Sequence, residues 1–198
     1  MRLNREGTEE GSRGTEGPPT NKYPRTAHGF MESDVKLEST IKEHVRKRHE
    51  ADDKEFLFGS ERVDLRRVDH LTLEVRKRDF AFTIDEPPER GGLDKGPNPL
   101  AYFMAGAAAC LMNQYLTDAI YRGVRLDDIS LAARGHFDRR MGGVFTEMVY
   151  DIKLSSPSPK DQVSSLAKEA EEMCYAHNTL KKAGVKMTTN IFLNGKAL

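Results

Sequence analysis

The chain contains two cysteines, Cys110 and Cys174, and these are the first candidates for chemistry. A thiolate can attack the O–O bond of a peroxide to give a sulfenic acid, with which a second thiol condenses to form a disulfide. Each cysteine falls on the apolar face of a segment with the period of a long helix. If these helices pack together, the thiols face each other, and the pair then predicts a redox site.

A structural interpretation competes with this one, because free cysteine often packs in a core as a small apolar side chain. Neither cysteine is expected in the first turn of its helix, so the helix dipole should do little to lower its pKa. A reactive thiol would then need a nearby cation, for which arginines of the strand region are the candidates. His177, one turn after Cys174, either tunes that thiol or is a core histidine with its own hydrogen-bond partner.

The composition limits the other classes of function. The 198 residues include 31 basic and 31 acidic side chains, with zero net charge, which argues against a protein that coats nucleic acid or an anionic membrane. No apolar run is long enough to span a membrane, and the first residues lack the apolar stretch of a secretory signal. We therefore expect a cytoplasmic protein with no nucleic-acid or membrane partner. The sequence has no Gly-rich phosphate loop and no metal-ligand cluster, so no cofactor is expected.

The N-terminal part divides into two segments. Residues 1–32 are polar and rich in Gly and Pro, as in a tail that cannot bury enough apolar surface to order itself. Residues 33–54 predict an amphipathic helix, because Leu37, Ile41 and Val45 recur every four residues. The basic run at 44–49 of this helix could bind phosphate. A solvated helix end, where cations complement the dipole, is the favoured interpretation because acidic residues follow at once.

Residues 55–198 predict one α+β domain. The expected elements are, in order, strands near 56–65, 71–76 and 80–85, a helix over 99–122, strands over 129–138 and 144–154, a helix over 158–183, and a strand over 185–193. The strands come in hairpins, which favours antiparallel sheets. The almost wholly apolar run from Leu100 to Leu116 predicts a central buried helix, and its small residues before Cys110 would admit a close backbone neighbour.

Two segments resemble the OsmC/Ohr family, the osmotically inducible and organic hydroperoxide resistance proteins. The first is Gly-Pro-Asn-Pro-Leu at 96–100, followed by a run of small residues that ends in Cys110. The second is Glu-Glu-Met-Cys at 171–174, followed by Asn-Thr-Leu at 178–180. The resemblance extends over roughly residues 55–194. It implies an OsmC-like fold with two long central cysteine-bearing helices, assembled as an intertwined homodimer whose sites lie at the subunit interface.

The resemblance also implies an activity, that of a thiol-dependent peroxidase acting on organic hydroperoxides. Cys110 would be the peroxidatic thiol and Cys174 the resolving thiol. An external dithiol reductant would then reopen the disulfide. An arginine would stabilise the thiolate and the charge that develops on the leaving oxygen, and Arg66 and Arg67 are the matching positions.

The sequence departs from the family pattern near that arginine. Arg76 and Arg78 are alternative matches. The family's peroxidases carry a glutamate that holds the arginine, and Leu100 occupies its position here. Glu86 or Glu89 from the preceding loop could replace that glutamate. Without a replacement, the Cys110 site should be more apolar and less strongly activated.

A further departure follows the second cysteine, where the family commonly has proline and this chain has Tyr175. These differences keep a second function open. The alternative is a non-peroxidase relative that binds a small apolar ligand in the pocket at the dimer interface.

Overall fold

The computed structural model describes residues 35–50 and 59–198. Its helices and strands are α1 (Val35–Glu50), β1 (Asp64–Asp69), β2 (Thr72–Lys77), β3 (Phe80–Ile84), α3 (Pro99–Arg122), β4 (Asp128–Asp138), β5 (Val144–Ser155), α4 (Lys160–Met173), α5 (Tyr175–Lys182), β6 (Lys186–Leu193) and β7 (Lys196–Ala197). The tail expected over 1–32 lies outside the described residues, and so do both ends expected for the helix over 33–54.

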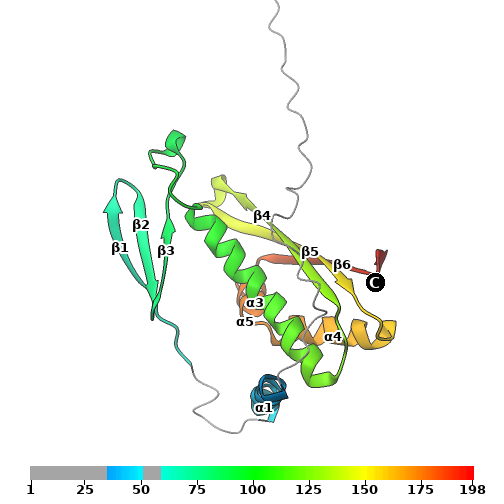
Figure 1. Ribbon diagram of the computed structural model, residues 1–198. Coiled ribbons are helices and arrows are strands. Elements are labelled where there is room, and N and C mark those ends of the chain that lie inside the picture. Colours follow the sequence, from blue (N-terminus) through cyan, green and yellow to red (C-terminus); the bar gives the residue numbers. More distant parts are fainter. Residues whose placement is uncertain (1–34, 51–58) are drawn as a thin grey trace, which may run out of the picture.

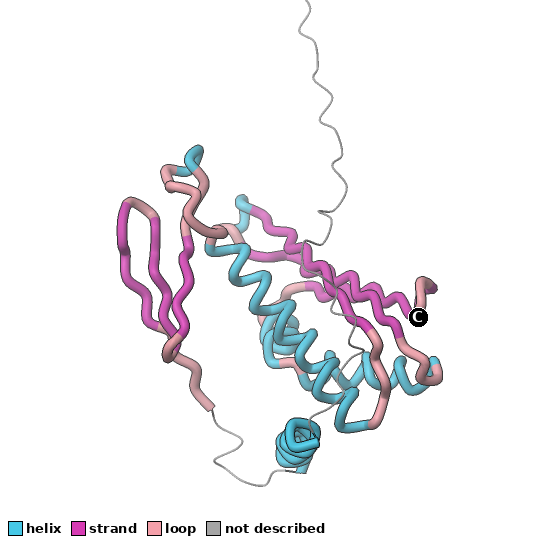
Figure 2. The backbone as a smooth tube through the Cα atoms, in the orientation of Figure 1, coloured by secondary structure: helices cyan, strands magenta, loops and turns pink. Residues whose placement is uncertain are grey.

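The strands form two sheets, which confirms the α+β class. Strands β1, β2 and β3 make an antiparallel meander, and the second sheet has the order β4-β5-β6-β7. Strands β5 and β6 pair in parallel, because α4 and α5 carry the chain back across the sheet between them. Figures 1 and 2 show the two sheets apart, with α3 running between them.

The strand expected near 56–65 lies elsewhere. Residues 59–63 carry no strand, and β1 instead occupies Asp64–Asp69; residues 56–58 lie outside the described part of the chain. The alternation of apolar residues is broken in β1 because the register shifts between Arg67 and Asp69. A bulge of this kind hides the period-2 signal from which a strand is predicted.

The core lies between the second sheet and the helices that cover one of its faces, as Figure 1 shows for α3, α4 and α5. Alternate residues of β5 point into it, and Met148, Tyr150 and Ile152 are fully buried. Gly135 on β4 lets α3 approach the sheet closely. A Cβ atom there would lie 2.4 Å from the Phe145 ring and 2.7 Å from the Met104 sulfur.

Helix α3 is buried over only part of its length in the described chain. Leu111, Tyr115 and Ala119 in its second half are fully or almost fully buried. In its first half, Leu100 is 44% exposed and Phe103 is 45% exposed. The prediction of a central helix buried throughout is therefore wrong for the single chain, and an apolar surface stays open before Cys110.

The loop that leads into α3 is organised by a buried carboxylate that the sequence analysis did not single out. Asp85 accepts hydrogen bonds from the Thr72 hydroxyl at 2.9 Å and from the backbone amides of Leu93 and Lys95, both at 3.2 Å. Burial acts to raise the pKa of Asp85, but the bond from the Glu86 amide at 2.8 Å, together with these bonds, outweighs it and lowers the pKa below its usual range. Asp85 thereby fixes the distance between β3 and the start of α3.

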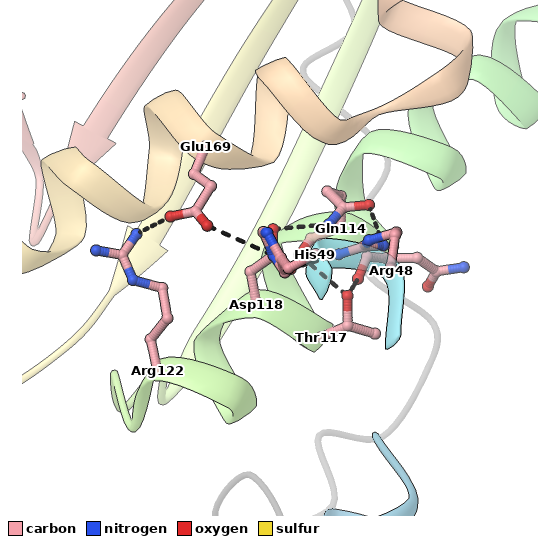
Figure 3. A network of polar contacts seen from close by, with 8 residues as sticks. Arg48, His49, Gln114, Thr117, Asp118, Arg122 and Glu169 are labelled. Carbon is pink, nitrogen blue, oxygen red and sulfur yellow. Dashed lines mark hydrogen bonds and ion pairs between the residues drawn. The ribbon is translucent and has the colours of Figure 1, made fainter. Parts of the chain in front are cut away.

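Helix α1 docks on the second half of α3 through charged groups (Figure 3). Arg48 binds Asp118 at 2.7 Å and Gln114 at 2.8 Å, and the side chain of Asp118 is only 1% exposed. Gln114 also donates to Asp118 at 2.6 Å. His49 stacks on Tyr121 with ring centroids 5.7 Å apart. Arg48 and His49, both in the basic run at 44–49, thus contact α3 instead of forming a phosphate site.

Candidate functional site

Helix α3 places Cys110 at the boundary between its exposed and buried halves. The helix begins after Asn98, whose side chain accepts a hydrogen bond from the Ala101 amide at 2.9 Å, and Pro99 occupies its first position. Cys110 follows three turns later and is partly buried against the core. Its sulfur is therefore held by a rigid element next to an open apolar surface.

Cys174 lies at a break between two helices, where one continuous helix was expected over 158–183. Its backbone leaves helical geometry, with φ −78° and ψ 117°, so that α4 ends at Met173 and α5 starts at Tyr175. Cys174 is thus the N-cap residue of α5, and its sulfur accepts a hydrogen bond from the His177 amide at 3.5 Å. The expectation that neither cysteine lies at a helix N-terminus is wrong for Cys174.

The structure brings the two cysteines together. The sulfur atoms of Cys110 and Cys174 are 3.5 Å apart, and both thiols are free. The contact is a hydrogen bond in which the Cys174 thiol donates to the Cys110 sulfur. A pair at this distance can close to a disulfide with a small movement of the side chains.

The two thiols are electrostatically unequal. The hydrogen bond from Cys174 lowers the pKa of Cys110; burial opposes this, and the backbone amides of Ala176 and Tyr175 lower it further. The same hydrogen bond and burial raise the pKa of Cys174. Cys110 is therefore the more acidic thiol of the pair, and Cys174 is the thiol that holds its proton more strongly.

Two buried polar side chains lie behind the pair. Burial, with the negative charge of the cysteine pair, raises the pKa of Tyr150 to about 12. Burial also lowers the pKa of His177, whose ring lies 6.5 Å from that of Tyr150. The His177 Nδ1 atom and the Tyr150 hydroxyl are buried without a hydrogen-bond partner among the described residues. His177 is thus a core histidine, but without the partner expected for one.

The candidate arginines lie on the β1–β3 sheet, away from Cys110 in this chain. Arg66 and Arg76 share one carboxylate, that of Glu74, at 3.0 Å and 2.6 Å. By the strand register, Arg67 lies on the opposite face of the sheet from these three residues. Arg78 lies in the β2–β3 turn, 5.7 Å from the centre of the Phe80 ring. Among the residues that the structure describes, no arginine contributes to the lowered pKa of Cys110.

The acidic candidates and Leu100 are also separated from Cys110 in the single chain. Glu86 pairs with Arg90 at 3.4 Å, and Glu89 is exposed in the loop. Leu100 precedes Cys110 by ten residues of one helix, a rise of about 15 Å. A side chain at position 100 therefore cannot act directly on the Cys110 sulfur of its own subunit.

No metal site accompanies the cysteines. Over 35–50 and 59–198, no group of three or more His, Cys, Asp or Glu side chains is arranged to hold a metal ion. No helix in these ranges is both long and apolar enough to cross a membrane.

Comparison with known proteins agrees with this fold. The sequence model of the OsmC-like protein family matches residues 92–190. The chain belongs to this family. A hydroperoxide reductase of Mycoplasma genitalium is 26% identical over 115 residues, which cover 57% of this chain and 80% of that protein.

Solved structures show the same fold at low sequence identity. The OsmC-like protein of Mycoplasma pneumoniae superposes with a TM-score of 0.62 at 19% identity, covering 68% of this chain and 97% of the other. The organic hydroperoxide resistance protein OsmC of Legionella pneumophila gives a TM-score of 0.55 at 18% identity, covering 68% of this chain and 98% of the other. Each of these structures therefore leaves about a third of this chain without a counterpart.

Proposed function

We propose that the protein is a thiol-dependent peroxidase that reduces organic hydroperoxides. The observation that carries the proposal is the 3.5 Å contact between Cys110 and Cys174, in which the first thiol is the more acidic and the second keeps its proton. The name of the Mycoplasma genitalium relative, a hydroperoxide reductase, supports the reaction class.

The proposed reaction has three steps. The Cys110 thiolate attacks the terminal oxygen of the hydroperoxide; the O–O bond breaks, and the alkoxide leaves and takes up a proton to become an alcohol. The Cys174 sulfur then attacks the sulfur of the Cys110 sulfenic acid, forming the S–S bond and releasing water. An external dithiol reduces the disulfide and is itself oxidised, which fits the expected cytoplasmic location, where thiol reductants are abundant.

We propose that the working unit is a homodimer. The register of β1–β3 places Leu65, Val75 and Phe82 on one face of the sheet, together with Arg67, and Leu65 is 53% exposed. The first half of α3 exposes further apolar side chains. A second copy of the chain would cover both surfaces, and we propose that Arg67, rather than Arg66, enters the partner's site.

The activity is tested by hydroperoxide consumption with a dithiol reductant. Cys110→Ser should reduce the rate to the uncatalysed background. Cys174→Ser should still react once and accumulate a sulfenic acid, which dimedone traps and mass spectrometry locates at Cys110. Because the surface before Cys110 is apolar, wild type should consume cumene hydroperoxide faster than hydrogen peroxide.

Two results would count against a peroxidase. One is an unchanged rate in Cys110→Ser. The other is a wild-type protein in which both thiols stay unmodified after mild peroxide treatment. In either case the alternative, a family member that binds a small apolar ligand at the dimer interface, becomes the better account of the exposed apolar surface.

A further inference from the structure

The resolving step of the proposed reaction needs a group that takes the proton of the Cys174 thiol, because the thiolate is the nucleophilic form. The side chain of Cys174 is fully buried, so its thiol does not face bulk water. The hydrogen bond to Cys110 and burial raise the pKa of Cys174, which disfavours spontaneous loss of the proton. A base that is buried beside Cys174 would overcome this barrier.

The buried side-chain atoms that lack a hydrogen-bond partner include one base. Among the described residues these atoms are Arg48 Nε, the hydroxyls of Tyr115 and Tyr150, and His177 Nδ1. Arginine is already a cation, and a neutral phenol is an acid rather than a base. With its proton on Nε2, the His177 ring has an acceptor at Nδ1. Burial lowers the pKa of His177 below its usual value, which keeps the ring neutral at pH 7.

The His177 side chain belongs to the same helix start as Cys174. Cys174 is the N-cap residue of α5, and His177 follows as its third residue. The His177 amide donates to the Cys174 sulfur at 3.5 Å. Side chains of a helix lean toward its N-terminus, and one at the third position reaches back toward the cap residue. The Cys174 amide is already bound to the Glu171 carbonyl at 3.3 Å, so the His177 ring is not needed to cap it.

Tyr150 on β5 locates the ring from the other side. The centroids of the Tyr150 and His177 rings are 6.5 Å apart. Tyr150 also lies close enough to the cysteine pair for the negative charge of that pair to add to the effect of burial on its pKa. The imidazole, the phenol and the two thiols therefore share one buried pocket.

The charged groups around the imidazole are few. Glu171, in the last turn of α4, acts to raise the pKa of His177, and Lys181 of α5 acts to lower it, but burial outweighs both. Helix α3 brings Cys110, whose sulfur is 3.5 Å from that of Cys174. On β6, Lys186 is bound to Glu147 at 2.9 Å. The ring therefore stays neutral and able to accept a proton.

We propose that the His177 imidazole accepts the proton of Cys174 as that thiol attacks the oxidised Cys110. The proposal deepens the proposed peroxidase function and rests on it for the sulfenic acid. The Cys174 sulfur forms the S–S bond, the S–O bond of the sulfenic acid breaks, and the leaving hydroxide takes a proton from solvent at the partly exposed Cys110. The Cys174 proton moves to Nδ1, and the imidazolium later returns it to solvent, so water is released and no net proton is consumed.

The attack by Cys174 can be measured without a hydroperoxide. Dithiobis(nitrobenzoate) reacts with the Cys110 thiolate, which releases one thionitrobenzoate and leaves the other in a mixed disulfide with Cys110. Cys174 then displaces this second thionitrobenzoate, and its colour reports the rate of attack. His177→Asn keeps a polar side chain but has no base. It should slow the second release about 100-fold and leave the rate of the first release unchanged.

Tyr150→Phe is the matched control. It removes the other unpartnered polar group of the same pocket and leaves the imidazole in place, so the second release should keep its wild-type rate. A wild-type rate in His177→Asn would overturn the proposal. Equal slowing in both variants would do the same, because it would assign the loss to disturbed packing.

A further measurement uses wild type, so it does not depend on the folding of a variant. The rate of the second release should fall as the pH drops through the pKa of His177, below about 6.5, because an imidazolium cannot accept a proton. It should level off above that pKa, with the midpoint that NMR of the ¹⁵N-labelled ring gives for His177. A rate that keeps rising above this midpoint would indicate direct ionisation of Cys174 and contradict the proposal. If the second release behaves as expected but no hydroperoxide is consumed, the role of His177 stands and the proposed peroxidase function fails.

Discussion

At the scale of single residues, the two cysteines of the site differ in how deeply their side chains are buried. Cys110 is partly exposed and has a lowered pKa, whereas Cys174 is fully buried and has a raised pKa. Behind them, His177 is only 4% exposed, and Tyr150 is fully buried. Burial favours the neutral forms of these two side chains, so negative charge at the site is expected on Cys110.

The burial of His177 predicts a pH-dependent stability. Burial lowers its pKa below the usual value of about 6.5, despite the opposing charge of Glu171 and with a smaller contribution from Lys181. The unfolded chain then binds a proton more readily than the folded one. The stability is fully present above about pH 6.5 and is lost as the pH falls below it, by at most about 1.4 kcal/mol per pH unit. His177→Phe should remove this slope between pH 7 and 5.5 in urea unfolding experiments. A His177→Phe protein with an unchanged slope would assign the pH dependence to other groups.

At the scale of elements, a buried polar network fixes α1 against α3. Asp118 accepts from both Arg48 and Gln114, and all three side chains are buried or nearly so. Arg48→Met would leave the Asp118 carboxylate without its cation. Breaking a buried pair on one side costs roughly 3–5 kcal/mol, and the retained Gln114 contact places the expected loss toward the lower end.

The comparison variant replaces Arg48, Gln114 and Asp118 together by Met, Met and Leu. It removes the buried charge and its polar partners at once, so it should be more stable than Arg48→Met alone. Urea unfolding followed by circular dichroism measures both. If Arg48→Met were as stable as wild type, the network would not be what holds α1 in place.

The elements also show what the sequence could and could not predict. The period of the apolar residues was enough to predict α3 and the β4–β5 hairpin, because both are regular and pack against the same core. The end of α4 at Cys174 carries no glycine, proline or other helix-breaking residue, so a continuous helix was expected. One signal was available: proline is common after the second cysteine of the family, and proline favours the first position of a helix. The site depends on that break, and so its electrostatics could not be predicted from residue types alone.

At the scale of the whole molecule, the β1–β3 sheet is amphipathic and only partly covered. It meets the rest of the domain at the first turns of α3, where Tyr102 stacks on Phe82 with ring centroids 4.9 Å apart and donates to the Thr83 carbonyl at 2.6 Å. The apolar face still leaves Phe80 65% exposed. Three strands gain independent stability by packing such a face against another layer.

The proposed homodimer supplies that layer, and two neighbouring positions on β3 test it. Phe80 and Ala81 point to opposite faces of the sheet, the first to the apolar face and the second to the face of Glu74 and Arg76. Phe80→Asp would place a charge in the interface, while Ala81→Asp adds the same charge on the polar face. We expect wild type and Ala81→Asp to be dimers and Phe80→Asp to be a monomer in sedimentation equilibrium at micromolar concentration.

If Arg67 of each chain also completes the partner's site, Phe80→Asp should reduce hydroperoxide consumption as well, although it leaves both cysteines in place. A monomeric wild type would contradict the dimer, and the apolar face of β1–β3 would then need a different partner.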